Sequence, residues 1–247
     1  MLYSVVMHKN LIHSEHIHER EQGRYIGDIV YGANDGIITT FAVISGAAGA
    51  SFSPGIIITL GLANLVADGI SMGVSNYLAI KSRLEYEKSE RAREEHEIAK
   101  FPEEERAEVL RVLKHWKIPE PHLHGALDAI TGDRKLWVDF MMKEELNIIE
   151  DKTDSPAKHG LATFISFAIA GSLPLLPFLI ISDTSSSFSV SIVATSISLF
   201  IVGAGRTYIT GGGRLYSGLQ MFAVGMFAAG SAYIIGMIIS SLLGVTL

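Results

Sequence analysis

Long apolar stretches alternate along this chain with short polar turns and one long charged stretch. A helix needs about 20 mainly apolar residues to cross a hydrocarbon core about 30 Å thick. The last three apolar stretches contain no Asp, Glu, Lys or Arg. We therefore predict an all-α polytopic membrane protein with five transmembrane helices, at Ile26–Ala50, Pro54–Ile80, Leu161–Ile181, Phe188–Gly205 and Leu215–Leu243.

The charged stretch between the second and third of these helices predicts a helical insert over residues 81–158. Strong helix formers continue the second membrane helix to Lys100, and Pro102 breaks the pattern and begins a second helix that ends near Lys117. Pro119 and Pro121 predict a turn after it. A third helix is expected from about Asp133 to Glu150. The predicted parts are thus an N-terminal arm (1–25), two membrane helices (26–80), the insert (81–158) and three membrane helices (159–247).

The distribution of Lys and Arg predicts the orientation in the membrane. Three of the 20 lie in the N-terminal arm, fifteen in the insert and its flanks, and two in the loop between the fourth and fifth helices. Positive residues gather on the cytosolic side of membrane proteins. We therefore expect the N-terminus and the insert in the cytosol and the C-terminus outside.

Composition excludes several kinds of chemistry. The chain has no cysteine, so disulfides, iron–sulfur clusters and cysteine nucleophiles are excluded, and methionine is the remaining soft ligand. The net charge of -6 comes largely from the insert, and we expect no nucleic-acid partner. We also expect no prosthetic group and no enzyme activity. The N-terminal arm lacks the apolar region of a cleaved signal. Its histidines could capture metal, or be incidental in a disordered arm: His8, His13, His16 and His18.

The first two predicted membrane helices contain three aspartates, Asp28 near the start of the first helix and Asp35 and Asp68 at greater depth. Ionisable groups at such depth cost about 2.5–3.5 kcal/mol on insertion scales, so Asp35 and Asp68 need an explanation. On the second helix Asn64, Asp68, Met72 and Asn76 follow one another at i, i+4 spacing and share one face. We predict an ion pathway along this face. The structural alternative is that the aspartates bond to neighbouring helices and that Met72 fills the core.

The ligand types on this pathway favour a borderline metal ion. Asp35 and Met72 lie at similar depth, so a carboxylate oxygen and a thioether sulfur can meet there. This pair suits iron(II) better than calcium or magnesium, which prefer oxygen ligands alone. Burial raises the proton affinity of a carboxylate, so exchange of protons for metal is expected. The same two helices each carry glycines four residues apart, which would allow close helix packing and would also be required by a dimer-lined pore. These glycines are Gly32, Gly36, Gly69 and Gly73.

Acidic residues of the insert recur at helical spacing. Glu87, Glu90, Glu94 and Glu97 share one helix face, where like charges destabilise a helix by roughly 0.2–0.5 kcal/mol per pair and a bound cation would reverse that penalty. The alternative to metal binding is that the glutamates form a solvated helix face and that Met141 and Met142 are core residues. The Glu-x-x-His step of ferritin-like di-iron sites is absent from the insert, which argues against an oxidase. The predicted metal ligands are Glu94, Glu97, Glu105, Glu108, Met141, Met142 and Glu145.

Several runs of the sequence resemble the vacuolar iron transporter family. They are Tyr31–Phe41 (YGANDGIITTF), Gly61–Gly73 (GLANLVADGISMG), Tyr77–Ala79, Gly171–Pro177 and Ser217–Met221. The resemblance implies a homodimer with its pore between the two copies of the first two helices. It implies export of iron(II) and related ions in exchange for protons, a pore lined by Asp35 and Met72, and metal binding at the seven insert residues above.

One departure from the family pattern concerns the pore. Members with a pore glutamate on the second helix have it where this chain has Asn64, and we expect Asp68, one turn further along, to take that role. The alternative functions are a membrane-anchored metal store or sensor and a membrane oxidase. Iron(II) and manganese(II) fit the ligands equally, and zinc(II) and cobalt(II) are further candidates. We expect the membrane to be the surface membrane of a prokaryotic cell.

Overall fold

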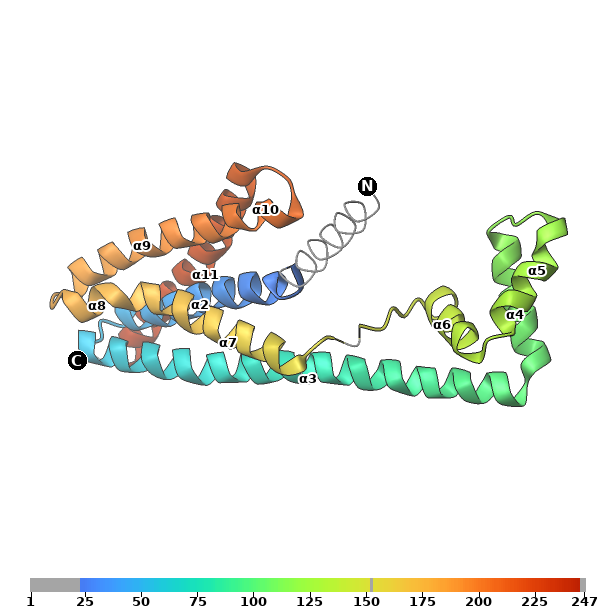
Figure 1. The fold of residues 1–247 in the computed structure, drawn as a ribbon. Helices are drawn as coiled ribbons and strands as arrows, with labels where there is room; N and C mark the ends of the chain where they lie inside the picture. The colour runs from blue at the N-terminus through green and yellow to red at the C-terminus, as the bar shows by residue number, and fades with distance from the viewer. Residues whose placement is uncertain (1–22, 152, 245–247) are drawn as a thin grey trace, which may run out of the picture. The chain divides into compact units, whose positions relative to one another are not determined.

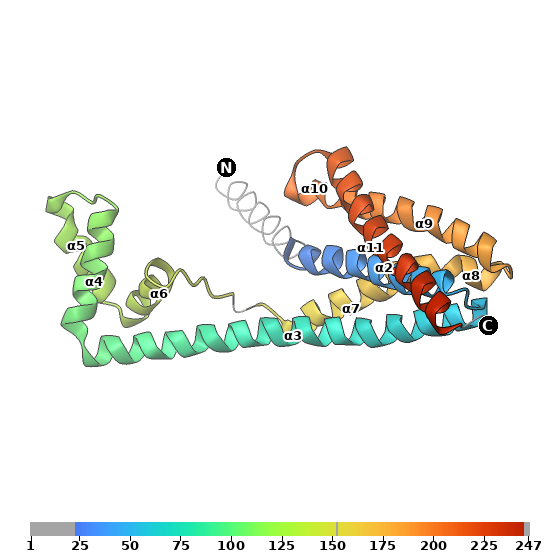
Figure 2. The same ribbon diagram turned by 180° about the vertical axis from the view of Figure 1, so that it is seen from behind.

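The structure is a computed structural model that describes residues 23–151 and 153–244, and the chain divides into two compact units. The first unit contains the residues up to Tyr77 and from Pro156, and we call it the bundle. The second, Leu78–Ser155, we call the insert. Every regular element of the described ranges is helical, and no strand occurs in them (Figures 1 and 2). The predicted all-α class is therefore confirmed.

Helix α2 lies at the centre of the bundle and packs against three others, α7, α9 and α11 (Figures 1 and 2). Short helices η1 (Leu173–Leu175) and α8 (Leu176–Ile180) continue α7, and α10 (Thr207–Thr210) follows α9. The main helices are α2 (Ile26–Gly49), the first part of α3 (Pro54–Lys100), α7 (Pro156–Ser172), α9 (Thr184–Gly205) and α11 (Arg214–Leu243). Their positions match the five helices that the apolar pattern predicts.

Glycines bring α2 and α3 into close contact with α7. A Cβ added at Gly36 would lie 2.4 Å from the carbonyl oxygen of Phe167, and one at Gly73 would lie 2.9 Å from that of Gly160. Only a residue without a side chain allows such approach. The close-packing interpretation of these glycines is therefore confirmed. Around them Phe41 and Phe167 fill the core of the bundle with almost no exposed surface.

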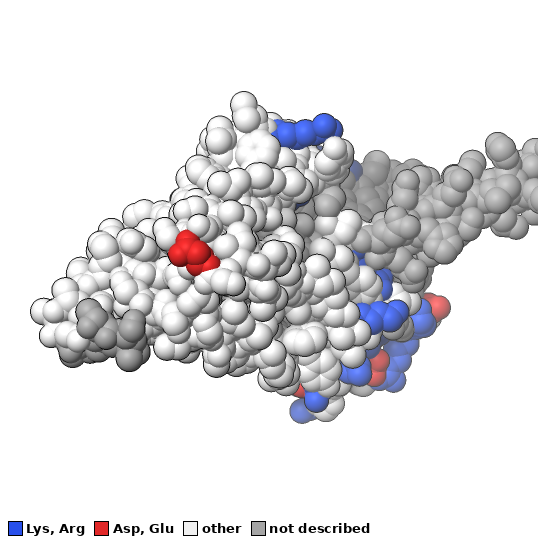
Figure 3. Space-filling view, turned by 90° about the vertical axis from the view of Figure 1, so that its left-hand side faces the viewer, with Lys and Arg blue, Asp and Glu red and all other residues white. Residues whose placement is uncertain are grey.

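Four of the predicted membrane helices are long and apolar enough to cross a membrane, namely α3, α7 with its continuation to Ile180, α9 and α11. Helix α2 is not among them, because Asn34 and Asp35 lower its mean hydropathy. The fifth span therefore stays a prediction. Figure 3 views the bundle from the end at which α8 lies, and the surface seen there is mostly free of charged side chains. The third predicted membrane helix, Leu161–Ile181, is interrupted by Pro174 and Pro177, which have no N–H to donate.

The insert contains the second part of α3, then α4 (Pro102–His115), α5 (Glu120–Thr131) and α6 (Arg134–Glu144). The predicted break before Pro102 is confirmed. Helix α4 ends at His115, before Pro119, as predicted. The predicted turn does not extend to Pro121, because Pro119 is the N-cap of α5 and Pro121 lies in the first turn of that helix, where a missing N–H costs nothing. The helix predicted from about Asp133 to Glu150, the third of the insert, ends at Glu144, because Asn147 adopts a left-handed backbone with φ of 56°.

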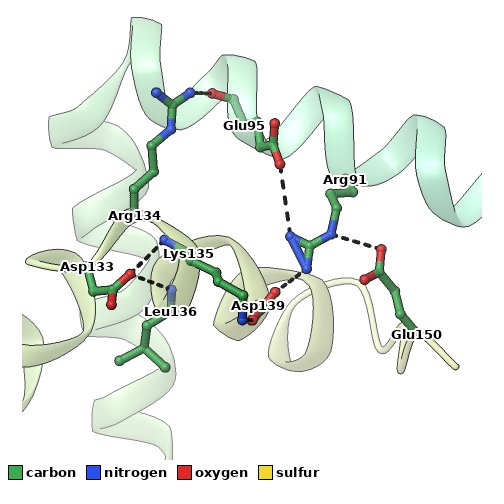
Figure 4. Close-up of polar contacts among 8 residues, drawn as sticks. All are labelled: Arg91, Glu95, Asp133, Arg134, Lys135, Leu136, Asp139 and Glu150. Carbon is green, nitrogen blue, oxygen red and sulfur yellow. Dashed lines mark hydrogen bonds and ion pairs between the residues drawn. The ribbon is translucent and has the colours of Figure 1, made fainter. Parts of the chain in front are cut away.

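A network of ion pairs joins α3 to α6 within the insert (Figure 4). The guanidinium of Arg91 donates to Glu150 Oε1 at 2.9 Å and to Asp139. The side chain of Asp133 caps the start of α6, and Arg134 donates to the backbone oxygen of Glu95 at 3.0 Å. These contacts hold α6 and the segment that follows it against α3.

Candidate metal sites

Three glutamates from three helices converge in the insert. Glu94 lies on α3, Glu105 on α4 and Glu145 at the C-terminal end of α6, and a carboxylate oxygen of each lies within 4.8 Å of the other two. Each glutamate is one helical turn from a buried apolar residue of a single core cluster, in the pairs Glu94 with Ile98, Glu105 with Val109 and Glu145 with Met141. Because residues four apart lie on the same helix face, packing of the apolar residues also brings the carboxylates together.

The three carboxylates, which we call the acidic triad, differ in exposure, because Glu94 and Glu105 are buried and Glu145 is exposed. Glu94 is 2% exposed, and no described residue forms a hydrogen bond with the buried Oε2 atoms of Glu94 and Glu105. Burial, followed by the charge of Glu145, raises the pKa of Glu94 to about 7. Burial, followed by the charge of Glu108, raises the pKa of Glu105 to about 7 and also raises that of Glu145.

Such a site is unfavourable unless something binds to it. A buried polar group that has lost water without gaining a partner costs about 1–3 kcal/mol, and more when it is charged. Among the described residues, no Lys, Arg or His forms an ion pair with Glu94, Glu105 or Glu145. Carboxylate oxygens that converge in this way are the ligands of a divalent cation. The triad therefore fits a metal ion.

Two further predicted ligands, Glu97 and Glu108, lie at the edge of the triad. Their charges act on the triad carboxylates, and each also has a cationic neighbour on its own helix. Glu97 lies 3.8 Å from Arg93, which also contacts Glu90 at 2.6 Å, and Glu108 contacts Arg111. These arginines can release the carboxylates toward a metal ion, since exposed pairs of this kind contribute only about 0–1 kcal/mol.

The two predicted methionine ligands are buried in the core and face different pockets. Met141 lines a pocket of about 610 Å³ together with Glu108 and Glu145. Met142 lines another, of about 360 Å³, with Arg91. Neighbouring positions on a helix differ by about 100° in direction, which explains the separation. The geometry thus places the Met141 thioether beside the acidic cluster, and metal binding by either methionine stays a prediction.

The intramembrane residues share one face of α3, as their spacing predicts. Asn64, Asp68, Met72 and Asn76 are all half-buried, whereas the residues between them are either buried against α7 or exposed. The charge of Asp68 acts on Asp35, so the two carboxylates of α2 and α3 lie near one another. The Nδ2 atom of Asn64 is buried and has no hydrogen-bond partner within residues 23–151 and 153–244. This face of α3 therefore carries the carboxylate of Asp68 and the amide of Asn64, and it lies near the carboxylate of Asp35 on α2.

Two of the predicted pathway residues also have structural contacts. Met72 packs against the bundle core that contains Phe167. The amide of Asn76 donates to Asp28 Oδ1 at 2.7 Å and to Thr163 Oγ1 at 2.7 Å. The position of Asn76 is therefore set by α2 and α7. A role of these two residues in transport stays a prediction.

The same network contains a histidine that sequence reasoning missed. Nδ1 of His159 lies 2.5 Å from Asp28 Oδ2, His159 is 5% exposed, and the Tyr25 ring packs on it at 4.7 Å between centroids. The sequence offered two signals for this pair, namely His159 just before the third apolar stretch and Asp28 within the first. Only the fold pairs them. The histidines predicted as metal captors in the N-terminal arm lie outside the described residues.

Comparison with known proteins identifies the family. The chain is 34% identical over 226 residues to the vacuolar iron transporter of Centaurea cyanus, covering 91% of this chain and 92% of the relative. It is 33% identical to vacuolar iron transporter 1 of Arabidopsis thaliana (88% and 87% covered) and 31% identical to the vacuolar iron transporter of Plasmodium berghei (93% and 86%). The sequence profile of the VIT family matches residues 26–237, and the chain belongs to this family.

Proposed function

We propose that this chain is a membrane transporter, and not an enzyme, that moves iron(II) and manganese(II) out of the cytosol in exchange for protons. The relatives are named as iron transporters. The observation that carries the proposal is the acidic triad of the insert, in which Glu94 and Glu105 have buried carboxylate oxygens that find no partner in the part of the chain the structure describes. A triad held together by a hydrophobic core would collect a divalent ion from the cytosol.

Proton release accompanies metal binding at the triad. Glu94 and Glu105 have pKa values of about 7, so each is partly protonated at neutral pH. A metal ligand must be deprotonated, and binding therefore displaces these protons. The oxygen ligands and the thioether of Met141 would favour iron(II) or manganese(II) over magnesium.

The second step of the proposed transport uses the two carboxylates of the bundle. Asp35 and Asp68 would bind the ion within the membrane, with Asp68 in the role of the family's pore glutamate because position 64 is Asn. This assignment requires α2 to be a fifth membrane span. A second copy of the chain would cover the exposed apolar side of α3, where Leu62, Val66 and Ile70 are each about half exposed.

Proteoliposomes that contain the full chain test the proposal. Iron(II) entry is followed with a quenched dye under anaerobic conditions, and lumenal pH is followed in parallel. We expect metal entry with proton exit in vesicles whose insert faces outward, and loss of both signals in Asp35→Asn and Asp68→Asn. Asp183→Asn is the control, because Asp183 is an exposed cap of α9.

The outcomes separate the alternatives. A membrane-anchored store or sensor would bind metal at the triad without any flux, and metal entry without a pH change would exclude proton exchange. Wild-type transport by Asp68→Ala would refute the role of Asp68 while leaving the triad untouched.

A further inference from the structure

The segment that joins α9 to α11 carries two arginines without acidic partners. Residues 184–244 contain no Asp or Glu. Nη2 of Arg206 donates to the neutral Gln220 Oε1 at 3.0 Å, and the guanidinium of Arg214 lies 4.4 Å from the centre of the Tyr208 ring. Neither arginine forms an ion pair within the part of the chain that the structure describes. Among the described residues, these two positive charges at one end of the bundle therefore have no acidic partner.

A groove of about 390 Å³ lies beside Arg206. Volumes of about 300–1,000 Å³ are typical of sites that hold small organic molecules. The walls are mainly apolar, and their polar members are Arg206, Thr210 and Asn34 of α2, whose buried Oδ1 has no hydrogen-bond partner among the described residues. The residues that complete the wall are Gly23, Ile26, Gly27, Val30, Tyr31 and Met221. A molecule that fits this groove has an apolar part and an anionic part.

The two glycines that line the groove, Gly23 and Gly27, have surroundings that differ from those of two glycines further along α2. Gly32 and Gly36 meet the backbone of α7, where an added Cβ would lie 2.5 Å and 2.4 Å from carbonyl oxygens. No described atom lies within 4 Å of a Cβ added at Gly23 or Gly27. Gly32 and Gly36 thus serve helix packing, and Gly23 and Gly27 leave the groove open.

Exposed tyrosines place the groove at the edge of the membrane. Tyr31, Tyr208 and Tyr216 are 59%, 75% and 74% exposed, and such side chains gather at the level of lipid headgroups. The arginines mark the side predicted to be cytosolic, where the leaflet carries anionic lipids. A guanidinium pairs well with phosphate oxygens.

We propose that this groove binds an anionic phospholipid. Its phosphate would lie against Arg206 and part of an acyl chain along Ile26 and Val30. A soluble phosphate would leave the apolar walls in contact with water, and an uncharged lipid would leave Arg206 without a counter-ion. The bound lipid would support α2, the helix that carries Asp35. This inference is independent of the transported ion.

Native mass spectrometry of the full chain in detergent tests the inference. The probes are phosphatidylglycerol, phosphatidylcholine with the same acyl chains, and glycerol phosphate without chains. We expect phosphatidylglycerol to bind about tenfold more tightly than phosphatidylcholine. Both lipids offer a phosphate to Arg206, but the choline ammonium of phosphatidylcholine repels the guanidinium, and like charges about 6 Å apart near a protein surface repel strongly enough for that factor. Arg206→Gln should abolish the preference. Gly27→Leu should block both lipids while keeping every charge, and Lys158→Gln, which removes a cation from α7, should change nothing.

Three outcomes would overturn the proposal. The first is equal retention of the two lipids by the wild type. The second is binding of glycerol phosphate as tight as that of the lipid, which would indicate a simple anion site. The third is lipid binding that appears only after removal of residues 1–22, which would assign the groove to the chain's own N-terminal segment. Folding of each variant is checked by its thermal unfolding, so that a lost preference is not mistaken for a lost fold.

Discussion

Replacement of Glu94 by Gln tests whether the acidic triad opposes folding of the insert until metal binds. The substitution keeps the size of the side chain and removes one of three carboxylates whose oxygens lie within 4.8 Å of one another. Since the folded-state pKa of about 7 lies above the unfolded value of 4.5, the folded insert binds more protons than the unfolded insert between these pH values. Its free energy of unfolding therefore falls as pH rises from 4.5 to 7.

The size of the effect follows from the same pKa. A rise from 4.5 to about 7 is about 2.5 units, and each unit corresponds to 1.36 kcal/mol, so the upper bound is about 3.4 kcal/mol. The carboxylates share this penalty and water reaches part of the cluster, so we expect about 1–2 kcal/mol. At pH 8, metal-free Glu94→Gln should exceed the wild type in stability by that amount. At pH 4.5 the two should differ little.

The position of the tryptophans makes the measurement specific. Both tryptophans of the chain, Trp116 and Trp137, lie in the insert, and Trp137 is buried in its core. Their fluorescence during urea unfolding of the full chain in detergent therefore reports the insert and not the bundle. Zinc(II), which has no redox chemistry, should reverse the order of stability. At 100 times its Kd it adds about 2.7 kcal/mol to the wild type and much less to the variant.

The matched control is Glu95→Gln, one position along α3. The side chain of Glu95 is 50% exposed and lies 4.0 Å from Arg91, so its loss should change stability by less than about 0.5 kcal/mol at either pH. Equal unfolding curves for wild type and Glu94→Gln at pH 8, with the same response to zinc(II), would refute the reasoning. The acidic triad would then be a solvated surface.

Three further predictions use the same preparations. Arg91→Gln should destabilise the insert by about 2 kcal/mol, read from the same fluorescence, because two carboxylates lose a charged donor; an unchanged midpoint would contradict the role of this network. Gly36→Ala should lower the thermal midpoint of the full chain, because its Cβ would lie 2.4 Å from a backbone oxygen, whereas Gly230→Ala, with no described atom within 4 Å, should not. Metal affinity measured by calorimetry should fall about 10–100-fold from pH 8 to 6 as Glu94 and Glu105 take up protons, and a flat profile would exclude them as ligands.

Helix positions were predictable because apolar length and proline are local signals. The break before Pro102 and the five apolar helices of the bundle follow from them. Helix α5 was missed because Pro119 and Pro121 are compatible both with a turn and with the first turn of a helix. The tertiary packing of Leu123 and Leu127 into the insert core decides in favour of the helix.

The candidate sites were predictable only in part, because spacing specifies a helix face and not the partners across it. The i, i+4 steps of Asn64, Asp68, Met72 and Asn76 correctly indicate one half-buried face. Nothing local indicates that Asn76 would bond to α2 and α7, or that Asp28 would meet a histidine 131 residues away. Such pairs depend on helix packing, which the glycine contacts determine.

The acidic triad links metal binding to the folding of the insert. Ile98, Val109 and Met141 can pack together only if the glutamates one turn away also converge. Packing of the core is therefore opposed by repulsion between the carboxylates, and a dication removes that repulsion. Because the unfolded chain cannot offer the same ligand geometry, the binding free energy adds to the stability of the folded insert. A weakened core, as in Val109→Ala, should for the same reason lower metal affinity although Val109 has no ligand atom.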